Sequence, residues 1–487
     1  MFNYKSSKRI LALTVALGAL CSQSVFAETM ELDLNDAIQR ALTTNPAIKI
    51  AVSEKKSSKA DLNAARAARG VTVSVTHQSG RGGYADDQYS RSLTSLTGAG
   101  SNYTPVYTVD NVGKGIGNSH SNGITASIPI YTGGQLSGAI DSAKANYKSY
   151  VLGESKAYID MKKTATDSYF GLLQTGNLEN LSQESVNQLA EHLKNVQAQY
   201  DVGVVAKVDV LRSEVALANA QQELITASNN YDVAEATLNK VIGTPMDTTL
   251  KLKDSLQYTP YENQMQYCLD YASANRAELE QSRLAVEAAK GAVKVAKSGF
   301  LPKVNASAGE DWGGSGSNWP GDDKENWTVG ISASMNIFDS GVTLSKVHSA
   351  EEKQLQAEES YRDTVDSVSL EVRSNYLNLR EAEKRISTTQ VAVAKAEEDY
   401  HIAQVRYMSG VGTNLDVIDA QVALTEAKTN FVNALYDYNT SKIALETSMG
   451  VPVAVPAADK TNLPLMSTDT NAATAETETA AVAPTAE

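Results

Sequence analysis

The sequence repeats itself over most of its length, and this duplication constrains the fold more than any other feature. The segment that begins at Tyr200 returns at Tyr407, so the two copies lie 207 residues apart (407 minus 200). The same shift relates two further pairs of landmarks, Gly134 with Gly341 and Gly243 with Gly450. Because this repeat is far longer than those of solenoid proteins, each half is expected to be one large structural module.

The landmarks divide the chain into five parts. These are a signal peptide at 1–27, a first repeat at 28–250, a linker at 251–262, a second repeat at 263–455 and a tail at 456–487. The tail is rich in alanine, threonine and acidic residues, a composition typical of disorder. The division therefore predicts two copies of one module between a leader and a disordered end.

The first 27 residues have the pattern of a secretory signal peptide. Lys5, Lys8 and Arg9 precede an apolar stretch at 10–20. Ala27 ends a short segment with the small residues typical of a signal-peptide cleavage site. A lipoprotein with a lipidated Cys21 is the weaker interpretation, because the large Leu20 precedes that cysteine. The chain is therefore expected to leave the cytoplasm.

The mature chain is acidic and nearly free of cysteine. Loss of the three basic leader residues takes the formal net charge from -14 to -17, which disfavours nucleic acid as a partner. Only Cys268 remains after cleavage, so no intrachain disulfide is expected. After the leader, no stretch approaches the roughly 18 to 20 apolar residues of a transmembrane helix.

Alternating apolar residues predict two strands in each half, at about 71–78 and 122–131 and at about 302–309 and 327–338. A half-buried sheet in a soluble domain would give the same alternation. The strands flank glycine-rich segments with aromatic residues, at 79–122 and 310–326, which are expected to be loops. Long loops next to alternating strands are typical of outer-membrane proteins.

Four strands cannot close a sheet, and an open edge is not tolerated in lipid. Several chains must therefore pool their strands. A dimer would give eight strands, a barrel filled by its own side chains, whereas a trimer gives twelve and leaves room for a passage.

Two proline-free segments, at about 133–201 and 340–408, predict very long helices of roughly 100 Å. Apolar residues in the second recur every three or four positions, which is typical of coiled-coil packing. The stripe comprises Val347, Ala350, Ala357, Tyr361, Val365, Val368, Val372, Leu379, Ala382, Ile386, Val393, Ala396, Tyr400, Ala403 and Tyr407. After turns at Gly203 and Gly410, shorter helices return to Gly243 and Gly450.

The returning helices are too short to match the long ones. Helices at about 34–68 and 265–298, stacked end to end on them, would supply the missing length. The predicted fold is mainly α with a small transmembrane β part. In it, a duplicated strand-helix module forms a trimeric 12-stranded β-barrel that continues into a 12-column α-helical barrel.

Several motifs resemble those of one known family. They are Leu-Asn-Asp-Ala-Ile at 34–38 with Asn45-Pro46, Tyr-Thr-Gly-Gly at 131–134, Asp-Val-Leu at 209–211, and Gly-Thr-Asn-Leu-Asp-Val-Ile-Asp-Ala at 412–420. They identify the chain as similar to the TolC family of outer-membrane efflux proteins over nearly all its mature length.

The resemblance implies a homotrimeric channel-tunnel in the outer membrane with a large periplasmic portion. It would be the exit duct of a tripartite efflux pump or a type I secretion system. The implied partners are outer-membrane lipid, a periplasmic adaptor (membrane fusion) protein and an inner-membrane RND or ABC transporter.

The resemblance also places a gate in this chain. Asp416 and Asp419 fall on positions where rings of aspartate line the periplasmic end of the tunnel, and such rings favour cations. Asp209 and Tyr407 match residues that tie the two helix pairs in the closed state, although Gly412 stands where an arginine often completes the tie. From the residues alone, these aspartates are more simply solvated charges or helix caps.

The turn residues match the tips that meet the adaptor in this family. They are Val202, Gly203 and Val204 in the first copy and Ser409, Gly410 and Val411 in the second. Read without the resemblance, the glycines are simple helix ends, because glycine readily adopts the left-handed conformation found there.

The sequence offers little that would suit an enzyme. Its five histidines, His77, His120, His192, His348 and His401, form no pair at metal-ligand spacing. The glycine-rich run at 313–316 lacks the lysine of a phosphate-binding loop. We therefore expect no enzymatic activity, cofactor or metal site. The alternative function is an exported coiled-coil filament or surface protein, which would need no membrane strands.

Overall fold

The computed structural model describes residues 29–84, 89–99, 102–111, 115–315 and 324–453. The predicted signal peptide at 1–27 and the predicted tail at 456–487 lie outside this range. The described chain forms two compact units. Unit 1 comprises residues up to 54 with 151–279 and 363 onwards, and unit 2 comprises 55–150 with 280–362. The boundaries fall within helices, so each unit contains parts of both sequence repeats.

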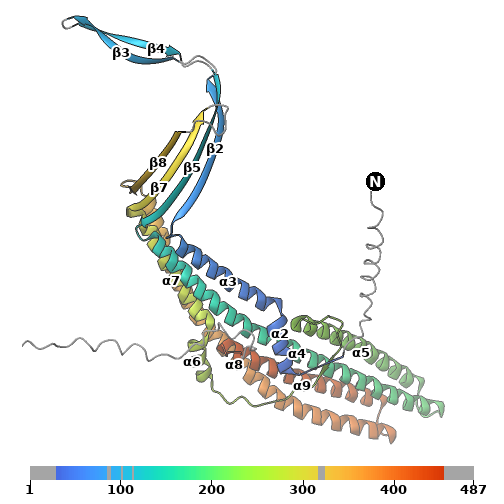
Figure 1. The fold of residues 1–487 in the computed structure, drawn as a ribbon. Coiled ribbons are helices and arrows are strands. Elements are labelled where there is room, and N and C mark those ends of the chain that lie inside the picture. The colour runs from blue at the N-terminus through green and yellow to red at the C-terminus, as the bar shows by residue number, and fades with distance from the viewer. Residues whose placement is uncertain (1–28, 85–88, 100–101, 112–114, 316–323, 454–487) are drawn as a thin grey trace, which may run out of the picture. The chain divides into compact units, whose positions relative to one another are not determined.

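Unit 2 contains a four-stranded antiparallel sheet in the order β2-β5-β7-β8 (Figure 1). The strands are β2 (Thr72–Tyr84), β5 (Gly115–Tyr131), β7 (Lys303–Ser315) and β8 (Lys324–Ser334). The register sets Val73 beside Ala126, Ala126 beside Ala308, and Ala308 beside Val329. One face of the sheet is therefore apolar, and it is exposed, with Val73 at 65% and Val329 at 74%.

The fourth strand is shorter than predicted at its C-terminal end, because β8 stops at Ser334 rather than near residue 338. The residues that follow lead into the cap of the next helix. There the Asp339 carboxylate accepts hydrogen bonds from the backbone N–H groups of Gly341 (3.1 Å) and Thr343 (2.8 Å). Asp339 therefore caps the start of this helix, a few residues after the strand ends.

The prediction of a loop at 79–122 is wrong, because most of that segment forms extensions of β2 and β5 and a separate hairpin of β3 (Tyr89–Ala99) and β4 (Asn102–Asn111). The prediction of a loop at 310–326 is wrong for its described residues, which belong to β7 and β8. Apolar and hydroxyl residues alternate in the hairpin, which is typical of a strand. Leu93 pairs with Tyr107 on one face, and the hydroxyls of Thr94 and Thr108 meet across the strands.

Two glycines let the helices of unit 2 approach closely. Gly138 lies in α4 (Gln135–Asp201) and Gly291 in α7 (Ala277–Lys297). A Cβ on Gly138 would lie 2.6 Å from the Gly291 carbonyl oxygen, and a Cβ on Gly291 would lie 2.7 Å from that of Gly138. Any larger residue would push these helices apart.

Unit 1 contains most of two long helical hairpins that lie side by side (Figure 1). One consists of α4 and α5 (Lys207–Ile242), the other of α8 (Val342–Met408) and α9 (Asn414–Met449). Both long helices have 67 residues and both returning helices have 36, as expected of copies of one module. Every residue of the apolar stripe predicted on α8 is buried or half-buried.

The two helices predicted at 34–68 and 265–298 are each broken into two, so these predictions are corrected. The first consists of α2 (Leu34–Thr44) and α3 (Pro46–Ala67), and the second of α6 (Met265–Asn275) and α7. Asn45 has an extended backbone, as expected of a residue before proline. Arg276 is also extended, and its guanidinium bonds the Thr447 carbonyl at 3.1 Å and Glu371 at 2.6 Å.

The predicted linker at 251–262 is not wholly irregular. Strand β6 (Leu250–Leu252) pairs in parallel with β1 (Met30–Leu32), a two-stranded sheet that sequence analysis missed. The buried Tyr169 hydroxyl lies 2.8 Å from the Asp254 carboxylate and anchors this region to α4. The equal helix lengths still support the proposal of repeats at 28–250 and 263–455.

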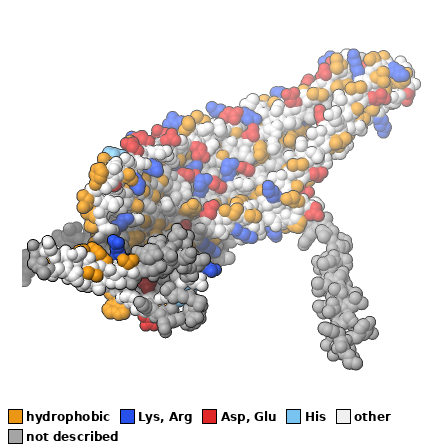
Figure 2. Space-filling model, turned by 90° about the horizontal axis from the view of Figure 1, so that it is seen from above, with side chains coloured by type: hydrophobic (Ala, Val, Ile, Leu, Met, Phe, Trp, Pro, Cys, Tyr) orange, Lys and Arg blue, Asp and Glu red, His pale blue; other side chains and the backbone are white. Residues whose placement is uncertain are grey.

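The helical surface carries mixed charge. On the face shown in Figure 2, acidic and basic side chains are interspersed over the helices, without a large field of one sign. Many are paired along a helix, for example Lys156 with Asp160 at 2.5 Å. Within the described residues, every helix is too short or too polar to be a candidate membrane span.

Candidate functional site: the tips of the helical hairpins

Both hairpins turn at a glycine with a left-handed backbone, Gly203 (φ 81°) and Gly410 (φ 76°). Only glycine adopts this conformation without steric cost. The residues around them are exposed, including three valines, Val202 at 75%, Val204 at 72% and Val411 at 69%. Ser409 is exposed as well. All six predicted tip residues therefore lie at two turns whose surface is largely apolar.

Asp416 closes the N-terminus of α9. Its carboxylate accepts a hydrogen bond from the Thr413 backbone N–H at 2.8 Å, and the Thr413 hydroxyl accepts one from the Asp416 backbone N–H at 3.2 Å. This capping box holds the pKa of the carboxyl below its ordinary value, chiefly through the Thr413 backbone bond and with a smaller contribution from Arg406. Asp416 therefore caps the helix, and its side chain remains exposed.

Asp419 lies one helical turn further along α9 and is exposed. Asp416, Asp419 and Glu426 follow one another at spacings of three and seven, so they share one exposed face of the helix. Val417 and Ala420 of the same helix are buried, in the apolar core around Tyr400. The structure thus gives α9 an acidic stripe that begins at the tip.

Tyr407 and Asp209 are close to each other but are not joined through their side chains. Tyr407 is buried, at 7% exposure, and its hydroxyl makes no hydrogen bond within the described residues. Burial raises the pKa of this phenol, and the charge of Asp209 raises it further. Asp209 takes part in the packing through its backbone carbonyl.

Sequence analysis missed a buried polar cluster just behind the tips. The Asn414 side chain donates to the Asp209 carbonyl at 2.9 Å and accepts from His192 Nε2 at 2.6 Å. The Ser213 hydroxyl lies 3.0 Å from the Asp209 carbonyl oxygen and 3.2 Å from the Asn414 amide oxygen, so these two acceptors share its one proton. The imidazole also packs edge-on against the Tyr407 ring, 5.3 Å between centroids. The cluster brings together residues of α4, α5, α8 and α9.

The apolar residues around this cluster form a common core of the two hairpins. Val196 of α4, Val210 of α5, Tyr400 of α8 and Val417 of α9 belong to it. Further from the turns, α4 and α9 are also in contact. Gln421 donates to the Ser185 hydroxyl at 2.6 Å, and Lys428 pairs with Glu184 at 3.0 Å. The hairpins are therefore held together by both apolar and polar contacts.

Gly412 follows the second turn, at the position where the resembled family often has an arginine. Its N–H donates to the Arg406 carbonyl at 3.0 Å. A Cβ here would lie 3.0 Å from the Tyr407 backbone nitrogen and 3.1 Å from atoms of Arg406. This tight turn leaves little room for a side chain at position 412.

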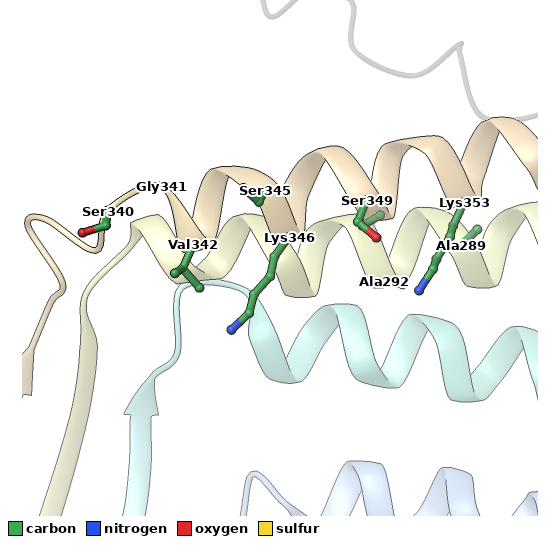
Figure 3. A pocket seen from close by; sticks show the side chains of 10 residues that line it. Ala289, Ala292, Ser340, Gly341, Val342, Ser345, Lys346, Ser349 and Lys353 are labelled. Atoms are coloured by element: carbon green, nitrogen blue, oxygen red, sulfur yellow. The ribbon is translucent and has the colours of Figure 1, made fainter.

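Two hollows lie on the surface of the helices. One, of about 510 Å³, lies between α5 and α9 near the tips and is lined by apolar residues such as Val208, Leu211 and Leu415. The other, of about 580 Å³, lies in unit 2 against the start of α8, where Lys346 and Lys353 project from the helix (Figure 3). No cluster of His, Cys, Asp or Glu suited to a metal ion occurs in the part of the chain that the structure describes.

Comparison with known proteins gives one consistent result. The sequence profile of the family described as "Outer membrane efflux protein" matches residues 37–244 and 268–451. Outer membrane protein TolC of Escherichia coli is 25% identical over 298 residues, which are 59% of this chain and 60% of that protein. The alkaline protease secretion protein AprF of Pseudomonas aeruginosa is 26% identical over 290 residues, 58% of this chain and 60% of that protein.

Solved structures show the same fold. The outer membrane protein VceC of Vibrio cholerae aligns with a TM-score of 0.69 at 19% identity, covering 86% of this chain and 96% of that one. The CusC channel aligns equally well at 16% identity, covering 87% of this chain and 93% of its own. The mainly α architecture with a smaller β part is therefore confirmed.

Proposed function

The chain belongs to the outer membrane efflux protein family, and from this premise we propose that it is the outer-membrane exit duct of a tripartite efflux pump or a type I secretion system. The family match over most of the chain carries this proposal. The description of the matched family mentions efflux, and the name of one relative mentions protease secretion, so efflux and secretion are both supported. We propose no enzymatic role, because the relatives are efflux and secretion proteins.

We propose that the working form is a homotrimer in the outer membrane. Within the described residues, β2 and β8 are the edges of the four-stranded sheet and have no further strand beside them. Unpaired edges are not tolerated in lipid, and the exposed apolar face of the sheet suits contact with lipid. Three copies would pool twelve strands into one closed sheet, with each β2 paired to a neighbouring β8.

We propose that the tips of the two hairpins form the gate. Asp416 and Asp419 start the acidic stripe of α9, so a threefold arrangement would set six carboxylates around one axis. Such a ring would favour cations and hinder anions. In the closed state, Asp209 of α5 would contribute its backbone carbonyl, and Tyr407 of α8 its buried ring, to the contact between the hairpins.

We propose that the exposed turns bind a periplasmic adaptor protein, which would connect the duct to an inner-membrane RND or ABC transporter. The three exposed valines at the two turns support this proposal, because apolar side chains at a protruding tip suit a protein partner. Gly203 and Gly410 would contribute the tight bend that presents them.

The test is single-channel recording from purified trimers in a planar bilayer. We compare the wild type with Asp416→Asn combined with Asp419→Asn. Asparagine keeps an oxygen that can accept the Thr413 N–H, so the capping box is less disturbed than it would be by alanine. Small cation-selective currents in the wild type, and loss of the selectivity in the double variant, are the expected result.

Two outcomes would contradict the proposal in different ways. Unchanged selectivity in the double variant would remove the gate role of these aspartates. The absence of any channel from well-folded wild-type protein, together with fibres in the culture medium, would favour the alternative filament function. A matched control is Glu426→Gln, a third carboxylate of the same stripe that lies further from the turn.

A further inference from the structure

The polar cluster behind the tips joins helices that a gate would have to separate. His192 lies on α4, Ser213 on α5, and Asn414 on α9. We propose that these three residues form the latch that keeps the gate closed. The inference rests on the proposed function, because a latch requires a gate, and it names the residues that regulate that gate.

The orientation of the Asn414 amide follows from its partners. The Asp209 carbonyl can only accept a hydrogen bond, so the Asn414 nitrogen must face it, at 2.9 Å. The amide oxygen therefore faces His192 Nε2 at 2.6 Å and the Ser213 hydroxyl at 3.2 Å. The imidazole must carry its proton on Nε2. One side chain at the start of α9 thus bonds both helices of the other hairpin.

Because the three side chains are buried, the loss of one of these hydrogen bonds is costly in free energy. Asn414 is 4% exposed, His192 is 6% exposed and Ser213 is 1% exposed. A polar group that loses its partner while it stays buried is costly, whereas one that becomes hydrated is not. The three bonds are therefore expected to break together when the hairpins separate and to re-form when they close.

A second buried hydrogen bond joins α4 and α9 further from the tips. Gln421 lies seven residues after Asn414, and Ser185 lies seven residues before His192, so the two pairs occupy matching positions on antiparallel helices. The Gln421 amide nitrogen lies 2.6 Å from the Ser185 hydroxyl. Separation at the tip would therefore reach this pair next, which places the latch at the position where opening begins.

The latch replaces a tie that the structure lacks. The Tyr407 hydroxyl makes no hydrogen bond within the described residues, and Gly412 has no side chain. The Tyr407 ring instead packs against His192, 5.3 Å between ring centroids, and so holds the imidazole in place. Asn414 takes over the link to Asp209 through the backbone carbonyl.

The experiment measures open probability in planar bilayers for trimers with Asn414→Ala, His192→Ala or His192→Gln. Loss of one buried hydrogen-bond partner is expected to raise the ratio of open to closed channels about tenfold in each alanine variant. The double alanine variant should open little more than either single variant, because the residues act as one unit. Glutamine can donate from nearly the same position as Nε2, so His192→Gln should stay closed.

A matched control separates the latch from general loss of stability. Asn239 is also a fully buried asparagine, but its amide bonds the Thr248 carbonyl at 2.7 Å, in the loop that follows its own helix. Asn239→Ala should lower thermal stability and leave open probability at the wild-type level. If Asn414→Ala does not assemble, His192→Ala carries the same test.

The outcomes distinguish the two levels of the inference. Folded, conducting trimers of Asn414→Ala and His192→Ala with wild-type open probability would overturn the latch and leave the duct intact. Equal opening in Asn239→Ala would also overturn it, because the effect would then follow from destabilisation. Wild-type trimers that form no channel would instead overturn the proposed function.

Discussion

His192 gives the proposed gate a pH dependence. Burial lowers the pKa of this imidazole below its ordinary value of 6.5, and its bond to Asn414 offsets this only in part. The closed state therefore holds the neutral ring, while an opened, hydrated ring would titrate near 6.5. The free-energy preference for the closed state is therefore complete above about pH 6.5. It decreases as the pH falls below that value, because protonation favours the opened, hydrated ring. Open probability should rise as the pH falls from 7.5 to 5.5.

The measurement is a pH series of single-channel recordings on the wild type and on His192→Gln, which cannot be protonated. The Tyr407 ring of α8 packs against the imidazole, and the helices around it carry further titratable groups, such as Asp209 of α5 and Asp416 of α9. All groups other than His192 remain in the variant, so any pH response that persists belongs to them. An unchanged response in His192→Gln would contradict the assignment to the imidazole.

At the residue scale, sequence motifs located the acidic stripe but not the latch. Asp416 and Asp419 occur in a distinctive motif, and the structure places both on one exposed face. His192 and Asn414 are 222 residues apart and follow no spacing rule. Neither a single histidine nor a single asparagine carries a signal until folding brings them together. The capping role of Asp416 was the simpler interpretation, and it is present.

At the element scale, the helix ends allow a comparison of two glycines with nearly the same backbone. Gly410 has φ 76° and Gly450 has φ 74°. A Cβ on Gly410 would meet nothing within 4 Å, whereas one on Gly450 would lie 2.9 Å from the Asn275 carbonyl oxygen. Gly410→Ala should cost about 1 to 2 kcal/mol from the left-handed backbone alone. Gly450→Ala should cost more, because the backbone contact must also give way.

Thermal unfolding of the two variants, followed by circular dichroism, tests this difference. The midpoint should fall further for Gly450→Ala than for Gly410→Ala. Gly330, with nothing within 4 Å of an added Cβ and no positive φ, offers a control substitution that should change the midpoint little. An equal fall in both helix-end variants would show that the contact with Asn275 is relieved at no cost.

Helix existence was predictable at this scale, but helix interruptions were not fully predictable. The break at Asn45 has a local cause in Pro46, which the prediction of one continuous helix overlooked. The break at Arg276 has no proline and depends on partners far away in sequence, such as Thr447. Glycine-rich composition suggested a loop at 79–122, although alternation of apolar and hydroxyl residues within it favoured strands. Local composition outweighed periodicity in that prediction.

At the scale of the whole molecule, the two sequence repeats differ by one inserted element. α6 starts 231 residues after α2 (265 minus 34), whereas α8 starts 207 residues after α4 (342 minus 135). The first half therefore holds 24 more residues between these points. The hairpin of β3 and β4, residues 89–111, accounts for nearly all of them. Duplication alone predicted the shared architecture, and this difference appears only when the elements are compared.

This hairpin should be dispensable for assembly and gating. In the described chain, β3 and β4 pair only with each other, and the four-stranded sheet is complete without them. The second repeat has no counterpart of this hairpin among its described strands and still supplies two strands to that sheet. Replacement of residues 89–111 by a short glycine-serine link should therefore leave trimer yield, open probability and cation selectivity unchanged. Loss of trimers would instead show that the exposed apolar face of the hairpin, with Leu93 and Tyr107, is buried between subunits.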